Sequence, residues 1–305
     1  METNMFVEAK TEEQKKREQT KRNKNATREM FRVFLGRGLL SKVCLVIVLI
    51  FIFLAVFAPL LTPYTPYQQS LKDKFLSPSA QHLLGTDQLG RDLLTRVIFG
   101  ARISLVTGLL STCWAAVLGV TLGLIAGYSR GFVQQFIMRV IDAQLSIPAL
   151  IFTMILIPVV GANIMGIGFL IGLTSIPAFT RMIYGQVLSL REQDYVTAAV
   201  LLGQSKAKIL IKHLLPNVFA TVIVMFSMNV GRAIMAEAGL AYLGVGLNPP
   251  LPAWGSMVSE GYKYLTIYPH LALYPGFALT ILIVTLSILG DGLRDSLDPK
   301  LRGKL

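Results

Sequence analysis

The sequence predicts an all-α, polytopic membrane protein with about six transmembrane helices. Three observations lead to this class: few charged residues, long segments without any charge, and basic residues that collect in alternate segments. Of the 305 residues, 53% are hydrophobic and 15% are charged, whereas soluble proteins carry about 25% charged residues. Charged side chains are absent from residues 43–71, 103–129, 143–180, 213–231 and 264–290. Such lengths fit membrane helices, because about 20 apolar helical residues cross a ~30 Å hydrocarbon core.

Four of these uncharged segments fit one transmembrane helix each. The expected helices are 42–61, 103–127, 217–236 and 271–290. The segment 143–180 is nearly twice as long, and Gly161-Ala162-Asn163 interrupts it. We therefore expect two helices there, over 140–160 and 164–182, joined by a tight turn. The total is six.

The distribution of basic residues predicts the topology. The net charge is +12, and eleven Lys and Arg residues lie between Lys10 and Lys42. Positive charge is retained on the cytoplasmic side of membrane proteins. With alternating sides, the inside segments hold 22 basic residues and the outside segments six. This bias indicates that both termini are cytoplasmic. It also explains the positive net charge through membrane topology, so nucleic-acid binding is not needed to account for it. The expected division is a cytoplasmic basic tail 1–41, the helix 42–61, an external segment 62–102, a membrane domain 103–290 and a cytoplasmic tail 291–305.

The external segment 62–102 should end in an amphipathic helix. Between residues 89 and 103, apolar side chains recur on one face and arginines lie elsewhere, namely Leu89, Leu93, Val97 and Ile98 against Arg91, Arg96 and Arg102. A helix with this pattern typically lies at the membrane interface.

The second transmembrane helix carries small residues at four-residue intervals, namely Ala115, Gly119, Gly123 and Gly127. Small residues at this period let two helix backbones approach closely. The stripe predicts close packing against another helix without identifying it.

The third and fourth helices contain Pro148, Pro158 and Pro177. Proline breaks backbone hydrogen bonds, and such breaks persist in membranes where neighbouring helices or a water-filled path satisfy the backbone. The prolines therefore favour positions beside other helices or beside a path.

The most informative segment is the loop over residues 195–217, which is too long for a simple connection. Its sequence pattern predicts a helix, a turn and a second helix. Gly203 is a natural break, Ser205 can cap a second helix, and Pro216 can occupy the first turn of the next transmembrane helix. Ala198 and Ala199 would let a short helix enter a groove of a partner protein.

This loop resembles the Glu-Ala-Ala loop of permease subunits from binding-protein-dependent ABC importers. The matching positions are Ala198, Ala199, Gly203, Leu215 and Pro216, and Thr197 stands where the family usually has Glu. The resemblance implies that these six residues belong to an ATPase-coupling loop over 185–216. The replacement of Glu by Thr197 puts a specific carboxylate contact to the ATPase in doubt.

Further segments resemble the dipeptide/oligopeptide/nickel subfamily, namely residues 85–92, 100–105, 237–246, 252–257 and 290–302. The likeness covers about residues 30–302 and points to the second, C-type permease. It implies an ABC importer permease (MetI-like) bundle with a cytoplasmic coupling helix. The expected cargo is an oligopeptide or dipeptide, with a nickel chelate as the alternative.

The resemblance also implies the partners. They are a homologous second permease, two ATP-binding subunits and an external substrate-binding protein, assembled in the bilayer of a bacterial or archaeal cytoplasmic membrane, without nucleic acid. ATP and Mg would be bound by the ATPase subunits, and no cofactor is expected in this chain. Closure of the ATPases would push the coupling helices and switch the path from inward-facing to outward-facing.

Three polar residues near the fifth helix are candidates for the translocation path: Asn229, Arg232 and Glu237. An Arg at a helix centre costs about 2.5–3.5 kcal/mol on insertion scales and should face protein or water. Arg232 could meet a carboxylate of the substrate or of the partner permease, or it could make a structural ion pair. Glu237 lies five residues further on, about 140° around the helix, and is not an obvious partner on the same face.

Functions of other classes, such as an enzyme or a metal-binding protein, find little support in the sequence. The chain has neither a His-Glu-x-x-His zinc motif nor a Gly-x-Ser-x-Gly nucleophile motif, so we expect a transport subunit without catalytic residues. Cys44 and Cys113 lack metal-ligand spacing, so no metal site is expected. The remaining alternative is a secondary transporter driven by an ion gradient, which broken helices and an intramembrane charge would also suit.

Overall fold

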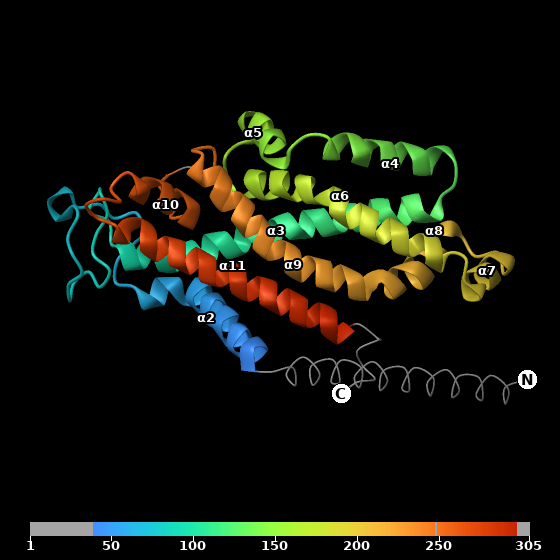
Figure 1. The fold of residues 1–305 in the computed structure, drawn as a ribbon, viewed down its shortest axis with the longest axis horizontal. Coiled ribbons are helices and arrows are strands. Elements are labelled where there is room, and N and C mark those ends of the chain that lie inside the picture. Colours follow the sequence, from blue (N-terminus) through green and yellow to red (C-terminus); the bar gives the residue numbers. More distant parts are fainter. Residues whose placement is uncertain (1–38, 248, 298–305) are drawn as a thin grey trace, which may run out of the picture.

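A computed structural model describes residues 39–247 and 249–297, and within these residues the chain is helical, without a named strand. Figure 1 shows an elongated bundle, with α10 and the segment before α3 at one end and α7 at the other. We call these the α10 end and the α7 end. The elements are α2 (Leu39–Leu61), η1 (Leu71–Asp73), α3 (Leu93–Tyr128), α4 (Phe132–Leu145), α5 (Ala149–Val160), α6 (Ile164–Leu190), α7 (Asp194–Leu201), α8 (Lys206–Ile209), η2 (Leu210–Leu214), α9 (Leu215–Tyr242), α10 (Trp254–Tyr262) and α11 (His270–Leu297).

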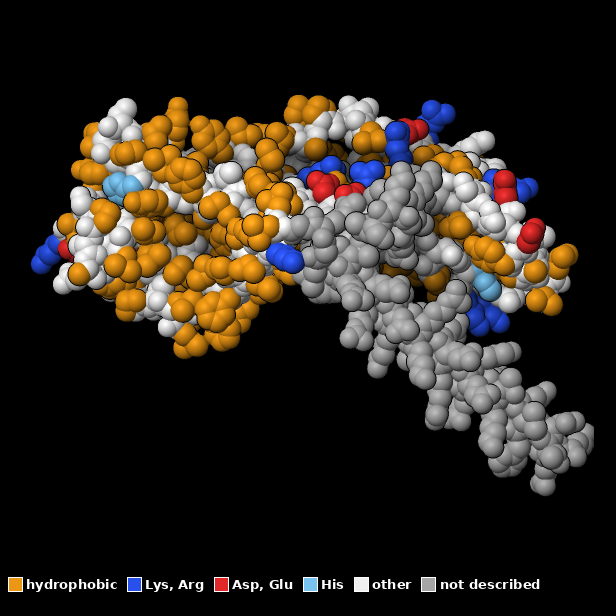
Figure 2. All heavy atoms as spheres, turned by 60° about the horizontal axis from the view of Figure 1, so that its bottom comes forward, with side chains coloured by type: hydrophobic (Ala, Val, Ile, Leu, Met, Phe, Trp, Pro, Cys, Tyr) orange, Lys and Arg blue, Asp and Glu red, His pale blue; other side chains and the backbone are white. Residues whose placement is uncertain are grey.

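The prediction of an all-α membrane protein is confirmed. Five helical segments in the described chain are long and apolar enough to cross a membrane, and a sixth span results if the bent pair α4–α5 counts as one. Figure 2 shows hydrophobic side chains over most of one half of the drawn face, with basic and acidic side chains near its middle and over the other half. Such a surface suits contact with lipid or with other membrane helices.

The small-residue stripe of α3 packs against α6. A Cβ atom placed on Gly123 would lie 2.8 Å from both Cβ of Ile183 and the carbonyl oxygen of Thr180, and one on Gly119 would lie 2.5 Å from Cβ of Phe179. The two backbones can approach this closely only because these glycines lack a side chain. The central helix pair of the bundle is therefore α3 and α6.

The expected interfacial helix over 89–103 does not exist as a separate element. The chain from Leu93 onward is the first part of α3, and Asp92 caps this helix by accepting a hydrogen bond from the backbone N–H of Thr95 at 2.8 Å. Arg91 and Arg96 are only 1% and 2% exposed. The prediction was wrong because the carboxylates of Asp87 and Glu260, and not lipid headgroups, satisfy these arginines.

The third predicted helix, 140–160, is also not a single helix. It consists of the end of α4 and the whole of α5, and these two helices meet at an angle of 94°. The break lies at Pro148, which precedes the first turn of α5. Proline restrains the residue before it to extended conformations, so a helix that arrives from α4 ends there.

The expected turn at residues 161–163 is present. Gly161 has a φ of 97°, and the side chain of Asn163 caps α6 by accepting from the N–H of Gly166 at 2.8 Å. By contrast, Pro158 and Pro177 lie inside α5 and α6 without ending them.

Several helices extend beyond their predicted ends. The helix α6 continues to Leu190, α9 covers 215–242 and not 217–236, and α11 continues to Leu297. The expected tails 1–41 and 291–305 fall mostly outside the described residues. The described parts of both are helical, since α2 begins at Leu39 and α11 runs past residue 291.

Candidate functional site

The loop around Gly203 folds as helix, turn and helix at the α7 end of the molecule (Figure 1). The turn depends on Gly203, whose φ of +69° is a conformation that other residues rarely adopt. After the turn, Ser205 caps α8 by accepting from the N–H of Lys208 at 3.4 Å. The loop is therefore a defined hairpin of two short helices.

The inner face of this hairpin is part of the hydrophobic core. Val196 and Ala199 of α7 are 1% and 3% exposed, and they share one buried cluster with Ile209 and Leu214. The same cluster contains Phe179 and Ile183 of α6 and Ala115 of α3. The hairpin is thus packed onto the central helix pair.

One polar contact ties the start of the hairpin to a membrane helix, and a second joins its turn to η2. Before α7, Arg191 donates from Nη1 to the carbonyl oxygen of Gly127 at 2.9 Å, which joins the loop to the last turn of α3. On the other side, His213 Nε2 lies 2.9 Å from Oε1 of Gln204, at hydrogen-bond distance. Leu215 and Pro216 then form the first turn of α9.

The outer face of the hairpin is exposed and apolar. Val200, Leu201 and Leu202 are 51%, 83% and 79% exposed, and Thr197 and Ala198 beside them are also exposed. Neighbouring apolar side chains on an exposed turn favour a protein contact. All six residues of the expected coupling loop therefore lie on this hairpin or at its junction with α9.

A basic hollow of about 550 Å³ lies between α7 and the end of α3. Thr197 lines it together with Arg130, Arg191 and Lys206. The part of the chain that the structure describes contributes three cations and no acidic residue to its lining, so the hollow suits an acidic group of a partner protein.

A second hollow, of about 510 Å³, lies between α6 and α9, and we call it the α6–α9 hollow. At its side, Gln186 of α6 donates to the hydroxyl of Thr221 of α9 at 2.7 Å. Its walls combine methionines with polar side chains. The lining residues are Ala178, Phe179, Met182, Gln186, Ala220, Thr221, Val224, Met225, Met228, Asn229, Arg232 and Arg294.

The structure brings two of the three path candidates into the α6–α9 hollow. Arg232 is exposed and lies near the middle of α9, whereas Asn229 is buried and donates to the hydroxyl of Thr112 on α3 at 3.3 Å. Arg294, in the last turn of α11, joins them. Sequence reasoning missed Arg294, because nothing in the local pattern shows that α11 ends beside α9.

Glu237, the third path candidate, is not in this hollow. Its side chain is 0% exposed, and neither carboxylate oxygen has a hydrogen-bond partner among the described residues. It lies one turn beyond Ile234, which packs against Gly108 of α3. Glu237 thus lies on a different face of α9 from Arg232, as its position about 140° around the helix indicates, and its role as a path residue stays a prediction.

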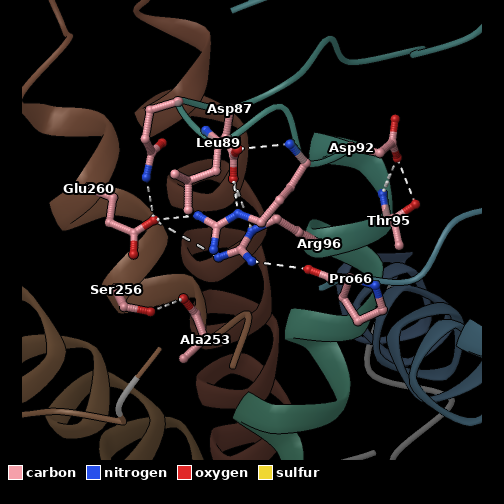
Figure 3. Close-up of polar contacts among 11 residues, drawn as sticks. Pro66, Asp87, Leu89, Asp92, Thr95, Arg96, Ala253, Ser256 and Glu260 are labelled. Carbon is pink, nitrogen blue, oxygen red and sulfur yellow. Dashed lines mark hydrogen bonds and ion pairs between the residues drawn. The ribbon is translucent and has the colours of Figure 1, made fainter. Parts of the chain in front are cut away.

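An ion-pair cluster joins the segment before α3 to α10 at the α10 end (Figure 3). Arg91 contacts Asp87 at 2.5 Å and Glu260 at 3.0 Å, and Arg96 lies 3.5 Å from Asp87. Gln88 also donates to Glu260, at 2.9 Å. Two cations and two anions balance one another here, so the cluster holds α10 in place.

Only half of this cluster had a sequence signal. The four-residue spacing of Asp87 and Arg91 indicates a local ion pair. Glu260, 169 residues from Arg91, carries no such signal, and the approach of α10 to α3 brings it into contact.

Elsewhere, the ion pair of Asp142 with Arg181 at 2.5 Å joins α4 to α6.

Comparison with protein families gives two matches. Residues 119–303 match the family described as "Binding-protein-dependent transport system inner membrane component". Residues 28–78 match the "N-terminal TM domain of oligopeptide transport permease C".

Relatives with curated names match over most of their length. The chain is 36% identical to the dipeptide transport system permease protein DppC of Alkalihalophilus pseudofirmus over 275 residues, 90% of each chain. It is 37% identical to the glutathione transport system permease protein GsiD of Pectobacterium atrosepticum over 276 residues, covering 90% of this chain and 91% of the relative.

Among solved structures, the fold is similar to a chain of the MetNI methionine ABC transporter in an inward-facing conformation. The TM-score is 0.55 with 18% sequence identity, and the match covers 67% of this chain and 96% of the other. At this identity the likeness concerns the fold.

Proposed function

Because the chain belongs to the family of binding-protein-dependent transport inner membrane components, as a C-type permease of the peptide and nickel subfamily, we propose that it is one permease subunit of an ATP-driven importer of short peptides. It is a multi-pass membrane protein and a transport component. Such a permease works together with another permease and with ATPase subunits. The family membership argues against the alternative of a transporter driven by an ion gradient.

The observation that carries the coupling role is the two-sided hairpin around Gly203. One side packs onto α3 and α6, and the other presents Leu201 and Leu202, which are 83% and 79% exposed. A partner that moves the exposed side moves a rigid element, because the inner side is buried among the membrane helices. The hairpin can therefore transmit a domain motion without any bond chemistry in this chain.

ATP hydrolysis belongs to the partner subunits in this proposal. Two ATPase subunits bind ATP and Mg, and each contacts one permease through its hairpin. The basic hollow beside Thr197 would accept an acidic group of the ATPase. This contact would replace the one that permeases of the family usually make through their own Glu at the position of Thr197. The second permease would complete the path along the α6–α9 hollow.

The proposed cargo is a short peptide. The two named relatives with 90% coverage are a dipeptide permease and a glutathione permease, and both names refer to short peptides. This favours a peptide over the nickel-chelate alternative. An external binding protein would select the peptide and deliver it at the α10 end.

The proposed location is the cytoplasmic membrane of a bacterium or archaeon, with both termini and the α7 end on the cytoplasmic side. The excess of basic residues in the inside segments supports this orientation.

The test is reconstitution of the chain with its neighbouring permease and ATPases in liposomes. We expect all subunits to copurify, and uptake of a radiolabelled dipeptide to require both ATP and the binding protein. A chain that purifies without ATPases, or that takes up the dipeptide when only an ion gradient is present, would contradict the proposal.

A further inference from the structure

We propose that the α6–α9 hollow is a binding site for the free carboxylate of a peptide, and that Arg232 and Arg294 make this permease selective for substrates with an unblocked C-terminus. This inference rests on the proposed function and adds a specificity that neither the family nor the names of the relatives contain. It concerns a site on the permease itself, separate from any selection by a binding protein.

The first argument is the lack of counter-charges. Arg232 and Arg294 line the same hollow, and neither forms an ion pair or a hydrogen bond within the described residues. Among the described residues that line this hollow, none is acidic. An unpaired guanidinium near the middle of a membrane helix is unfavourable by several kcal/mol. The two groups therefore favour an anion that arrives from outside this chain.

The second argument is that the geometry of a guanidinium group matches that of a carboxylate. Arg presents a planar set of donors that matches a carboxylate in a bidentate manner. The hollow offers two such groups on different helices, Arg232 on α9 and Arg294 on α11. Within this one hollow a carboxylate can therefore be bound by a guanidinium from α9 or by one from α11.

The third argument is the nature of the walls. Met182, Met225 and Met228 supply flexible, polarisable side chains, which adapt to apolar groups of different shape. Gln186 and Asn229 supply amides that can contact a peptide backbone. A permease for varied peptides needs this combination, because the carboxylate is the constant part and the side chains vary.

The hollow is also large enough for part of a short peptide. Its volume of about 510 Å³ falls within the ~300–1,000 Å³ typical of small-molecule sites. Because α6 and α9 line most of it and Arg294 of α11 also contributes, a substrate there would touch helices that pack on the coupling hairpin.

The experiment measures binding of two probes to the intact assembly in nanodiscs without binding protein. The probes are a tripeptide with an N-terminal fluorescein and a free C-terminus, and the same tripeptide as its C-terminal amide. The variants are Arg232→Gln, Arg294→Gln and Arg232→Lys. The matched control is Arg139→Gln, which changes an exposed arginine of α4 outside the hollow.

We expect the unaltered assembly to bind the free acid about 10-fold more tightly than the amide, as a charge-assisted contact predicts. Arg232→Gln and Arg294→Gln should reduce this preference toward 1, Arg232→Lys should retain part of it, and Arg139→Gln should leave it unchanged. Equal binding of acid and amide by the unaltered assembly would overturn the inference. Dissociation of the two permeases in Arg232→Gln would also overturn it, because Arg232 would then pair with the partner permease.

The same preparations are assayed for ATP-dependent uptake of both tripeptides, the free acid and the amide, with binding protein present. Uptake without any preference for the carboxylate refutes only this inference. A complete lack of peptide uptake refutes the proposed function itself.

Discussion

Arg191 Nη1 lies 2.9 Å from the carbonyl oxygen of Gly127 and donates a hydrogen bond to it. This contact connects the residue that follows α6 with the last turn of α3. Gly127 also ends the small-residue stripe, where an added Cβ would lie 2.6 Å from Cβ of Val187. The segment that leads from α6 into the hairpin and one of the close contacts between α3 and α6 therefore meet at Gly127.

Replacement of Arg191 should uncouple ATP hydrolysis from transport. In Arg191→Met the side chain keeps its apolar stem but loses the donor to Gly127, so the hairpin loses this polar tie to α3 and keeps only its apolar packing. We expect ATPase activity to persist in the intact assembly while peptide uptake falls at least several-fold. Arg130→Met is the matched control, because Arg130 lines the same basic hollow without a hydrogen bond in the described chain. Equal loss in both variants would show that charge, and not the tether, matters.

The contact of α3 with α6 should tolerate no side chain at Gly123. A methyl group there would lie 2.8 Å from Cβ of Ile183 and from the carbonyl oxygen of Thr180, so the helices must separate. We expect Gly123→Ala to destabilise the protein by about 1–3 kcal/mol, as overpacking typically does. A fluorescence melting curve of the purified assembly measures this.

The control for this variant is Gly185→Ala on α6, where no atom lies within 4 Å of an added Cβ. Alanine is the better helix former by about 1 kcal/mol, so Gly185→Ala should leave the melting temperature unchanged or raise it. Similar melting temperatures for the two variants would refute the packing argument.

The turn of the coupling hairpin should depend on backbone conformation alone. Gly203 has a φ of +69°, and nothing lies within 4 Å of an added Cβ. A residue other than glycine costs about 1–2 kcal/mol in this conformation, with Asn among the most tolerant. We expect Gly203→Val to lower ATP-dependent uptake strongly and Gly203→Asn to retain most of it. Equal uptake by both variants would mean that the turn geometry is unimportant.

The ion-pair cluster at the α10 end should stabilise the position of α10. In Glu260→Gln, Arg91 and Arg96 keep Asp87 as their single counter-charge, so we expect a loss of about 1–3 kcal/mol. Glu192→Gln, at an exposed position before α7, is the control and should have no effect on stability. Thermal unfolding of the assembly measures the difference, and a stability of Glu260→Gln equal to the control would contradict the role of the cluster.

Hydropathy and local sequence pattern were sufficient for the class of fold and for the helix, turn and helix around Gly203, because both depend on local patterns, whereas the coupling role stays a prediction. The turn at Gly203 follows from a glycine between two helical segments, and the stripe ending at Gly127 from a four-residue period. Patterns that depend on distant partners were not predictable. The pattern of apolar and basic residues near Arg96 resembled that of an interfacial helix. The sequence does not show that Nη2 of Arg96 lies 4.0 Å from Oε2 of Glu260.

The candidate path shows the same limit. Arg232 was recognisable as a charge within an apolar helix. Its shared hollow with Arg294 depends on how α11 packs on α9, where an added Cβ on Gly290 would meet Cγ of Met228 at 2.8 Å. For Glu237 the angle around the helix correctly indicated a face different from that of Arg232, but the sequence does not show that this side chain is fully buried.

The central claim is that the exposed side of the hairpin contacts an ATPase subunit. The most direct measurement places a photo-crosslinking amino acid at Leu202, which is 79% exposed, in the reconstituted assembly, with Leu83 at the α10 end, 63% exposed, as the comparison position. We predict a cross-link from position 202 to an ATPase subunit that changes in yield when ATP is added, and no such product from position 83. A cross-link from position 202 to the binding protein, or to no polypeptide at all, would contradict the account.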